Sequence, residues 1–330
     1  MPHKRRLQAA FLAGSGLLLA SLLSGCASTP PTEPPAEVTR TAPARTASRA
    51  SSGPFCGSPR AWTVREQDRV LQFAQVIRDE LEQAPDNSVA IIGRSGLDLS
   101  RFHLRYSHGG ILLKSGTEVP WSVRQLYYDC KLGYPRLYDQ GLAGYLLAAE
   151  APDLAFVSVV LLPKQQAALL RETALDTQRI AGLLAGRYSA NAYPYSTRYQ
   201  NCNQWTAELL ASAWGQLDDG PRLRERAQAW LGRQGYVPEP VHVGSHLVKF
   251  VASLMPLIHL DDHPPDDQLG LAFRFSLPRD IEAFVQARIP EATRIEFCHD
   301  HDQVVIRHGW QALGEECRAD DNDRLVRILD

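Results

Sequence analysis

The chain has 330 residues, of which 22% are charged and 44% hydrophobic, and its formal net charge is −2. This length and balance fit a globular protein of one large domain or two modest ones. The lack of a basic excess argues against a general affinity for nucleic acid. No stretch after residue 30 is long and apolar enough to span a bilayer.

The N-terminus has the layout of a secretory signal. A basic segment, residues 4–6, precedes an apolar core over residues 7–23. The core ends in Leu23-Ser24-Gly25-Cys26, which resembles a bacterial lipobox. The resemblance implies cleavage before Cys26 and lipidation of its sulfur and its new amino group, and several acyl chains anchor a protein stably to a lipid membrane. The alternative is an ordinary cleaved signal followed by an incidental cysteine.

The residues after the lipobox predict where the protein resides. Ala27, in place of aspartate, resembles the Gram-negative pattern sent to the outer membrane, so we expect an outer-membrane lipoprotein on the periplasmic side of the bacterial envelope. Residues 28–53 are rich in Pro, Thr, Ala, Ser and Arg without a hydrophobic period, which predicts a disordered tether. The predicted organisation is a signal peptide at 1–25, a lipidated cysteine and tether at 26–54, and a single domain at 55–330.

The cysteine count predicts one free thiol. The chain contains Cys26, Cys56, Cys130, Cys202, Cys298 and Cys317. Lipidation of Cys26 leaves five, an odd number, and the periplasm is oxidising. At least one thiol therefore stays free or pairs outside the chain. A disulfide between Cys298 and Cys317 is plausible because they flank a predicted strand, but other pairings remain open.

The periodicity of the sequence predicts a mixture of helices and strands. Thr63 and Glu66 form a capping box ahead of an apolar helical pattern that runs to residue 83. Strands are predicted over residues 88–92, 102–114, 121–128, 154–162 and 271–277, with a hairpin of 294–298 and 303–307. Further helices are predicted over residues 164–184, 202–214, 222–231, 246–258 and 278–287, with a loop at 185–200. Segregated helices and hairpin strands indicate the α+β class.

Cys202 is the candidate nucleophile. It begins a predicted helix, in Asn201-Cys202-Asn203-Gln204-Trp205, on the side that meets the rest of the domain. Unpaired N–H groups and the helix dipole favour an anion there, which predicts a lowered thiol pKa and a place for an oxyanion. Tyr199, Asn201 and Gln204 are candidates for a supporting or substrate-contacting role. A cysteine at a helix start is also often purely structural.

His108 is the candidate base. It lies on a predicted strand in Tyr106-Ser107-His108-Gly109-Gly110, where glycine lets another backbone come close. The next strand offers Gln125, with Glu118 as second choice, to orient the imidazole through a hydrogen bond. The alternatives are a satisfied polar histidine and a bulge at the two glycines.

Four blocks of sequence resemble a known bacterial family, called domain of unknown function 2145, between residues 55 and 280. They are Tyr106-Ser107-His108-Gly109-Gly110, Trp121-Ser122-Val123-Arg124-Gln125-Leu126, Leu137-Tyr138-Asp139-Gln140-Gly141-Leu142, and Tyr193 to Trp205. The order of His108 before Cys202 also resembles the papain-like fold of NlpC-type cell-wall peptidases in its circularly permuted form, in which the histidine strand precedes the cysteine helix.

The resemblance implies a papain-like core, in which an antiparallel sheet packs against a nucleophile-bearing helix, with additional helices and a C-terminal strand hairpin. It implies Cys202 as nucleophile, His108 as base and Gln125 in the third polar position. Many members of the closer family have histidine in that third position, so Gln125 is a departure.

The leading hypothesis is a thiol hydrolase or acyltransferase that forms a thioester at Cys202 with an amide or ester substrate. A cell-wall peptide or an envelope acyl group is the natural substrate class for an anchored enzyme. No metal or organic cofactor is required. Residues 259–267 lack the helical or finger spacing of a metal site, and His299 and His301 could bind a metal but are also explained by a hairpin turn. The alternative is a non-catalytic envelope lipoprotein that uses the same fold to bind a partner or ligand.

Overall fold

The computed structural model describes residues 61–114, 121–148 and 153–328. The predicted signal peptide, the lipidation site Cys26 and the tether lie outside these described residues. Cys56, the turn at Gly116 and the second-choice partner Glu118 lie outside them as well.

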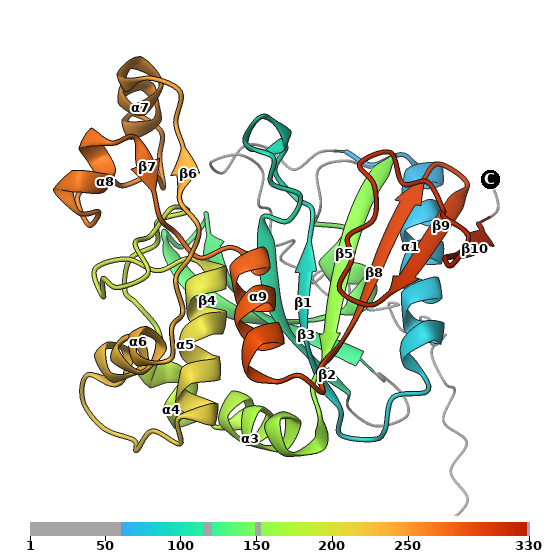
Figure 1. Ribbon diagram of the computed structural model, residues 1–330, viewed down its shortest axis with the longest axis horizontal. Coiled ribbons are helices and arrows are strands. Elements are labelled where there is room, and N and C mark those ends of the chain that lie inside the picture. The colour runs from blue at the N-terminus through green and yellow to red at the C-terminus, as the bar shows by residue number, and fades with distance from the viewer. Residues whose placement is uncertain (1–60, 115–120, 149–152, 329–330) are drawn as a thin grey trace, which may run out of the picture. The chain divides into compact units, whose positions relative to one another are not determined.

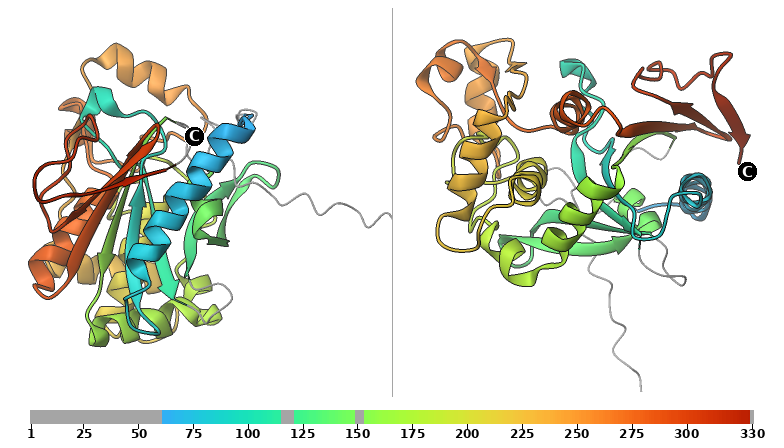
Figure 2. Two further views of the ribbon diagram at one scale, coloured as in Figure 1. Left: turned by 90° about the vertical axis from the view of Figure 1, so that its right-hand side faces the viewer. Right: turned by 60° about the horizontal axis from the view of Figure 1, so that its bottom comes forward.

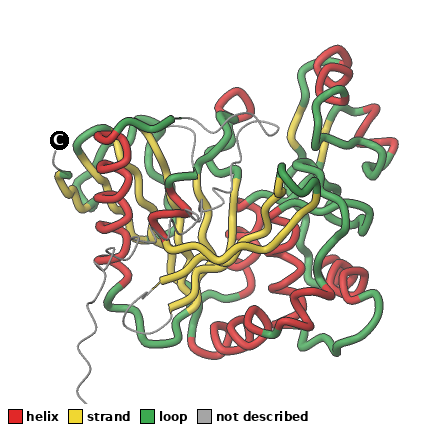
Figure 3. Tube along the Cα trace, turned by 180° about the vertical axis from the view of Figure 1, so that it is seen from behind, coloured by secondary structure: helices red, strands yellow, loops and turns green. Residues whose placement is uncertain are grey.

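The described strands build one large antiparallel sheet and a separate short pair. The large sheet has the order β10-β9-β8-β5-β1-β2-β3-β4, and every neighbouring pair in it is antiparallel (Figures 1 and 3). Its strands are β1 Val89–Arg94, β2 His108–Lys114, β3 Trp121–Asp129, β4 Tyr134–Gly141, β5 Leu154–Leu161, β8 Thr293–Asp300, β9 Gln303–His308 and β10 Arg324–Arg327. The short pair is β6 Val241–His242 with β7 Ala272–Phe273.

Helices cover both faces of the large sheet, and apolar side chains fill the two layers between. One face carries α1 Val64–Leu81 and α2 Leu142–Leu146, packed on alternate residues of the strands such as Ala90 and Leu112. The other face carries α3 Lys164–Leu175, α4 Thr177–Gly182, α5 Cys202–Trp214, α6 Leu223–Arg233 and α9 Pro278–Arg288, packed on the intervening residues (Figure 2). Period-two alternation places successive side chains on opposite faces, which explains this division.

A smaller group of elements lies away from the sheet. It contains α7 His246–Ser253, α8 Pro265–Leu269 and the β6–β7 pair (Figure 1). The α7 helix exposes the apolar side chains of Leu247, Phe250 and Val251. Within the described ranges, no helix combines the length and the apolar character needed to cross a bilayer.

The structure confirms the α+β class and several element boundaries. Thr63 caps α1, and the side chains of Thr63 and Glu66 make the reciprocal hydrogen bonds of the capping box. The α5 helix runs from Cys202 to Trp214 as predicted, and β8 and β9 form the predicted hairpin. Cys298 and Cys317 form a disulfide, Cys130 is also disulfide-bonded, and Cys202 is a free thiol.

The larger differences from the prediction concern four elements, and two of them have a clear local reason. Strand β2 begins at His108 and not at residue 102, because residues 100–102 form a 3-10 turn that ends at the left-handed residue His103. The helix predicted over 164–184 is divided at Asp176, whose carboxylate accepts hydrogen bonds from the N–H groups of Gln178 and Arg179 and so caps a second helix. The strand predicted at 271–277 is reduced to β7, and the helix predicted at 246–258 ends at Ser253. Strand β4 was not predicted.

Candidate functional site

The start of α5 is fixed by its N-cap residue. The Asn201 side-chain oxygen accepts a hydrogen bond from the Gln204 N–H at 2.7 Å, and its Nδ2 donates to the Ala190 carbonyl at 3.0 Å. Cys202 is therefore the first residue of the helix, and the residue is 3% exposed. The cap both ends the preceding loop and holds the thiol at the helix terminus.

The other two predicted supporting residues hold the loop that leads to the cysteine. Gln204 Nε2 lies within 3.1–3.3 Å of three loop carbonyls, those of Tyr193, Pro194 and Ser196. The Tyr199 ring stacks on His259 with centroids 4.4 Å apart, and its hydroxyl donates to Asp261. These contacts give Gln204 Nε2 and Tyr199 a role in holding the loop that leads to Cys202.

The N-terminal turn of α5 contacts the first residues of β2. Asn203 Nδ2 donates to the Ser107 carbonyl at 3.2 Å. A Cβ added at Gly109 would lie 2.8 Å from Asn203 Oδ1, so glycine is needed for this approach. A Cβ at Gly110 would lie 2.7 Å from the Arg124 carbonyl on β3. The two glycines therefore serve the close packing that the sequence predicted, one toward the helix and one toward the neighbouring strand.

The His108 imidazole is oriented by a chain of two glutamines. Its Nε2 lies within hydrogen-bond distance of Gln125 Oε1, and Gln125 Nε2 donates to Gln140 Oε1 on β4. Because a carboxamide oxygen only accepts, Nε2 carries the hydrogen and Nδ1 keeps a lone pair. The ring lies 4.9 Å from that of Tyr127, and the Tyr145 hydroxyl donates to the His108 carbonyl at 3.1 Å.

The thiol and the imidazole both lie close to Tyr145, whose pKa responds to the charge of Cys202 and whose ring contacts that of His108. Cys202 belongs to the apolar core that also includes residues of α3, α6 and α9, and the His108 ring lies beside Tyr145 of α2. Strands β2 and β3 pair only from Ile111 onward, so the start of β2 is unpaired on its β3 side. No hydrogen bond in the described part of the chain joins Sγ to the ring. The residues that bring the two segments together are Gly109 and Asn203.

The prediction of a lowered thiol pKa was wrong. Burial raises the pKa of the Cys202 thiol to about 11, although the backbone N–H of Gly109, the Arg94 guanidinium and the N–H groups of the helix start act in the opposite direction. Burial, followed by the charge of Arg94, lowers the pKa of His108 to about 3. At neutral pH both groups are therefore uncharged in this state, and no thiolate–imidazolium pair exists before a substrate arrives.

Three residues near the site were not found from the sequence. Arg94 ends β1 directly opposite His108, Gln140 lies on β4, and Tyr145 lies on α2. Arg94 could have been noticed in the sequence, since it is a charged residue directly after the apolar segment from Val89 to Gly93. Gln140 and Tyr145 fall in two elements that were not predicted.

The histidines and aspartates considered as metal ligands have other contacts. His263 Nε2 lies 2.7 Å from the Asn191 carbonyl, and Asp267 forms an ion pair with Arg274. His299 is buried in β8 beside the ring of Phe73. Over residues 61–114, 121–148 and 153–328, no group of three or more His, Cys, Asp or Glu side chains is arranged to hold a metal ion.

Comparison with known proteins gives one match. No curated protein and no solved structure matches the chain. A family model matches residues 80–285, more than half of the chain, including β1 to β5, His108 and the whole of α5. The chain therefore belongs to the bacterial family described as "Uncharacterized protein conserved in bacteria (DUF2145)".

Proposed function

We propose that the protein is a thiol hydrolase or acyltransferase that acts on an amide or ester, with Cys202 as nucleophile and His108 as base. One observation carries the proposal. A free thiol begins a helix that contacts the start of the strand bearing His108, and that imidazole is held in the tautomer a base needs. The order of the two residues and the position of Gln125 also resemble the permuted NlpC-type arrangement of papain-like enzymes.

The proposed reaction begins with a proton transfer. His108 Nδ1 takes the proton from Cys202 Sγ as the sulfur bonds to the carbonyl carbon of the substrate. The tetrahedral intermediate then expels its amine or alcohol, which receives the proton back from Nδ1, and a thioester remains on Cys202. Water or an acceptor amine attacks the thioester, with His108 again acting first as base and then as acid.

The helix start supplies the electrostatic part of this reaction. The backbone N–H groups of Cys202 and Asn203 act on the sulfur, and N–H groups in the first turn have no acceptor within the helix. Such donors stabilise a developing oxyanion in a site from which water is excluded. Since thiol and imidazole are both neutral at rest, binding of the substrate must accompany the proton transfer.

Replacing the two proposed catalytic residues tests the reaction. We expect p-nitrophenyl acetate to form an acetyl thioester on Cys202 in the full chain and none in Cys202→Ala, as measured by intact mass. We expect His108→Ala to slow the acylation by about 100-fold or more, because the neutral thiol then lacks its base. His299→Ala, which removes another buried histidine, is the matched control and should acylate at the native rate.

A non-catalytic binding protein is the second candidate, and one observation favours it. Cys202 is 3% and His108 8% exposed, so the described state offers a substrate little access to either group. Under this alternative Cys202 is a packed core residue. Acylation that is equally slow in the native chain and in His108→Ala would support the binding role and contradict the hydrolase.

We also propose that the protein acts at the membrane surface of the bacterial envelope, anchored through acylated Cys26, on a cell-wall peptide or an envelope acyl group. The lipobox-like sequence supports this location. In a bacterial host, we expect the native chain to incorporate labelled palmitate and to sediment with membranes. Cys26→Ser should lose both properties, whereas Cys202→Ser should keep them. Equal label in the native chain and Cys26→Ser would contradict the anchor.

A further inference from the structure

Arg94 is a buried arginine beside the candidate site. It is the last residue of β1, paired with His108 on β2 and with Val157 on β5, and it is 1% exposed. Its guanidinium lies 5.0 Å from the centre of the Tyr145 ring, and the hydroxyl of Tyr145 donates to the His108 carbonyl. A positive charge is thus placed within the packed interior next to the imidazole.

Most of the hydrogen-bonding capacity of Arg94 is unused. A guanidinium has five N–H donors. Nη1 donates to the Ser95 carbonyl at 3.0 Å, while Nε and Nη2 are buried without an acceptor. Among the described residues no carboxylate forms an ion pair with Arg94. Burial of a charged group without a counter-charge is strongly unfavourable, so this arrangement needs a reason other than stability.

Two other buried arginines of the chain are each neutralised by ion pairs with buried carboxylates. Arg224 is paired with Glu208, and Arg294 is paired with both Glu282 and Glu296. The nitrogen–oxygen distances in these ion pairs are 2.8 to 3.2 Å. Arg94 has the geometry of such a partner, but the described residues supply no acid for it, which leaves its donors available to an anionic ligand.

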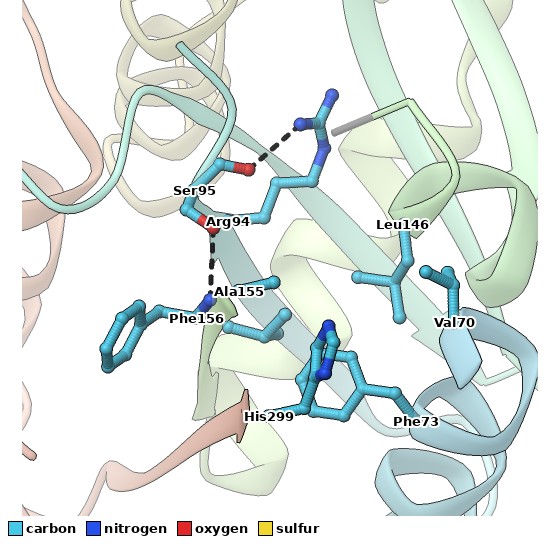
Figure 4. A pocket seen from close by; sticks show the side chains of 9 residues that line it. Val70, Phe73, Arg94, Ser95, Leu146, Ala155, Phe156 and His299 are labelled. Carbon is cyan, nitrogen blue, oxygen red and sulfur yellow. Dashed lines mark hydrogen bonds between the residues drawn. The ribbon is translucent and has the colours of Figure 1, made fainter. Parts of the chain in front are cut away.

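The guanidinium lies close enough to the reacting groups for its charge to act on Cys202 and His108. Figure 4 shows the Arg94 side chain above a small cavity, with its guanidinium directed away from Phe73 and His299. Its charge lowers the pKa of Cys202, His108 and Tyr145 relative to burial alone, so it acts on all three. The cavity of about 10 Å³ is large enough for roughly one water molecule. Because Nε and Nη2 are buried, a ligand must move a neighbouring side chain to reach them.

We propose that Arg94 binds a carboxylate of the substrate and thereby selects acyl compounds that carry a negative charge near the scissile carbonyl. The inference rests on the proposed function of Cys202. A planar guanidinium with two adjacent free donors matches the two oxygens of a carboxylate, and a buried pair of this kind gains strength from the low dielectric around it.

Two alkylating reagents of nearly equal size test the proposal. Iodoacetate is anionic and iodoacetamide is neutral, and both transfer a substituted methyl group to Sγ with loss of iodide. Alkylation of Cys202 in the full chain is followed by mass spectrometry at constant ionic strength. We expect the ratio of the iodoacetate rate to the iodoacetamide rate to fall by about tenfold or more in Arg94→Met, since the charge-assisted hydrogen bonds from Nε and Nη2 are lost. Arg94→Lys should retain part of the ratio.

The control is Arg318→Met, which changes the net charge equally at an exposed position whose side chain is 81% exposed. Its ratio should match that of the native chain. A native ratio in Arg94→Met would overturn the carboxylate site while leaving the hydrolase proposal intact. If p-nitrophenyl acetate did not acylate the native chain, but the alkylation ratio still depended on Arg94, the hydrolase proposal would be overturned and the anion site would remain.

A competition experiment on the native chain covers the case in which Arg94→Met does not fold. Acetate, compared with chloride at the same ionic strength, should slow alkylation by iodoacetate more than alkylation by iodoacetamide. Equal slowing of both reagents by acetate would overturn the proposal.

Discussion

Arg224→Met is expected to lower the free energy of unfolding by about 3–5 kcal/mol, because it leaves a carboxylate buried without its counter-charge. Arg224 donates to both oxygens of Glu208, at 2.8 and 3.0 Å, and the side chain of Glu208 is fully buried. The same guanidinium donates to the carbonyls of Thr197 and Tyr199 in the loop before Cys202. Urea denaturation followed by circular dichroism measures the loss.

Two variants separate the buried charge from the other effects of the substitution. Arg224→Met combined with Glu208→Gln removes both charges and should recover part of the lost stability. Arg233→Met, at an exposed position of the same helix, should change stability by no more than about 0.5 kcal/mol. If the double variant were as unstable as the sum of its single variants, the penalty could not come from an uncompensated charge.

The two buried histidines, His108 and His299, are each expected to destabilise the fold as the pH falls below 6.5. Burial lowers the pKa of His108 to about 3 and that of His299 to about 4. Between these values and 6.5 the unfolded chain binds more protons than the folded chain, so stability falls as the pH falls through this window. Each histidine should cost about 3 kcal/mol by pH 4. Unfolding free energies measured from pH 8 to pH 4 test this.

His299→Leu removes the contribution of His299 to the pH dependence of stability and leaves that of His108. Its stability at pH 8 reports packing alone, because the native imidazole is neutral there in both states. Between pH 6.5 and pH 4 its stability should fall with a smaller slope than that of the native chain. A slope equal to the native one would mean that His299 is charged in the fold, or that it has moved to water.

The sequence predicted well those helix starts that depend on hydrogen bonds between residues close together in the chain. The capping box of Thr63 and Glu66, and the start of α5 at Cys202, depend on hydrogen bonds within a few residues. The break at Asp176 was also local, but helix propensity on both sides obscured it. Strand β4 gave no clear alternation, since much of it lies partly exposed at the edge of the sheet, and Gln140 was missed with it.

The electrostatic character of the candidate site could not be predicted from the sequence. The helix start does act to lower the pKa of Cys202, as its position suggested. The opposite effect of burial depends on how tightly α5, β2 and α2 pack around the thiol, and only the tertiary structure shows this. The side of the sheet to which His108 points likewise follows from the register of β2 on β1 and not from the spacing of its neighbours.

The pairing of β8 with β5 limits how the chain can be truncated. The segment that matches the family model ends at residue 285, before β8, yet β8 covers all eight residues of β5 from Leu154 to Leu161. A fragment cut there would expose an apolar strand with unpaired backbone groups, which is a template for aggregation. It would also remove Glu296 of β8, which accepts a hydrogen bond from Arg105 at 2.8 Å. The segment that leads from Arg105 to His108 would then lose this anchor. Any family member that stops near that residue must shield this strand by other means.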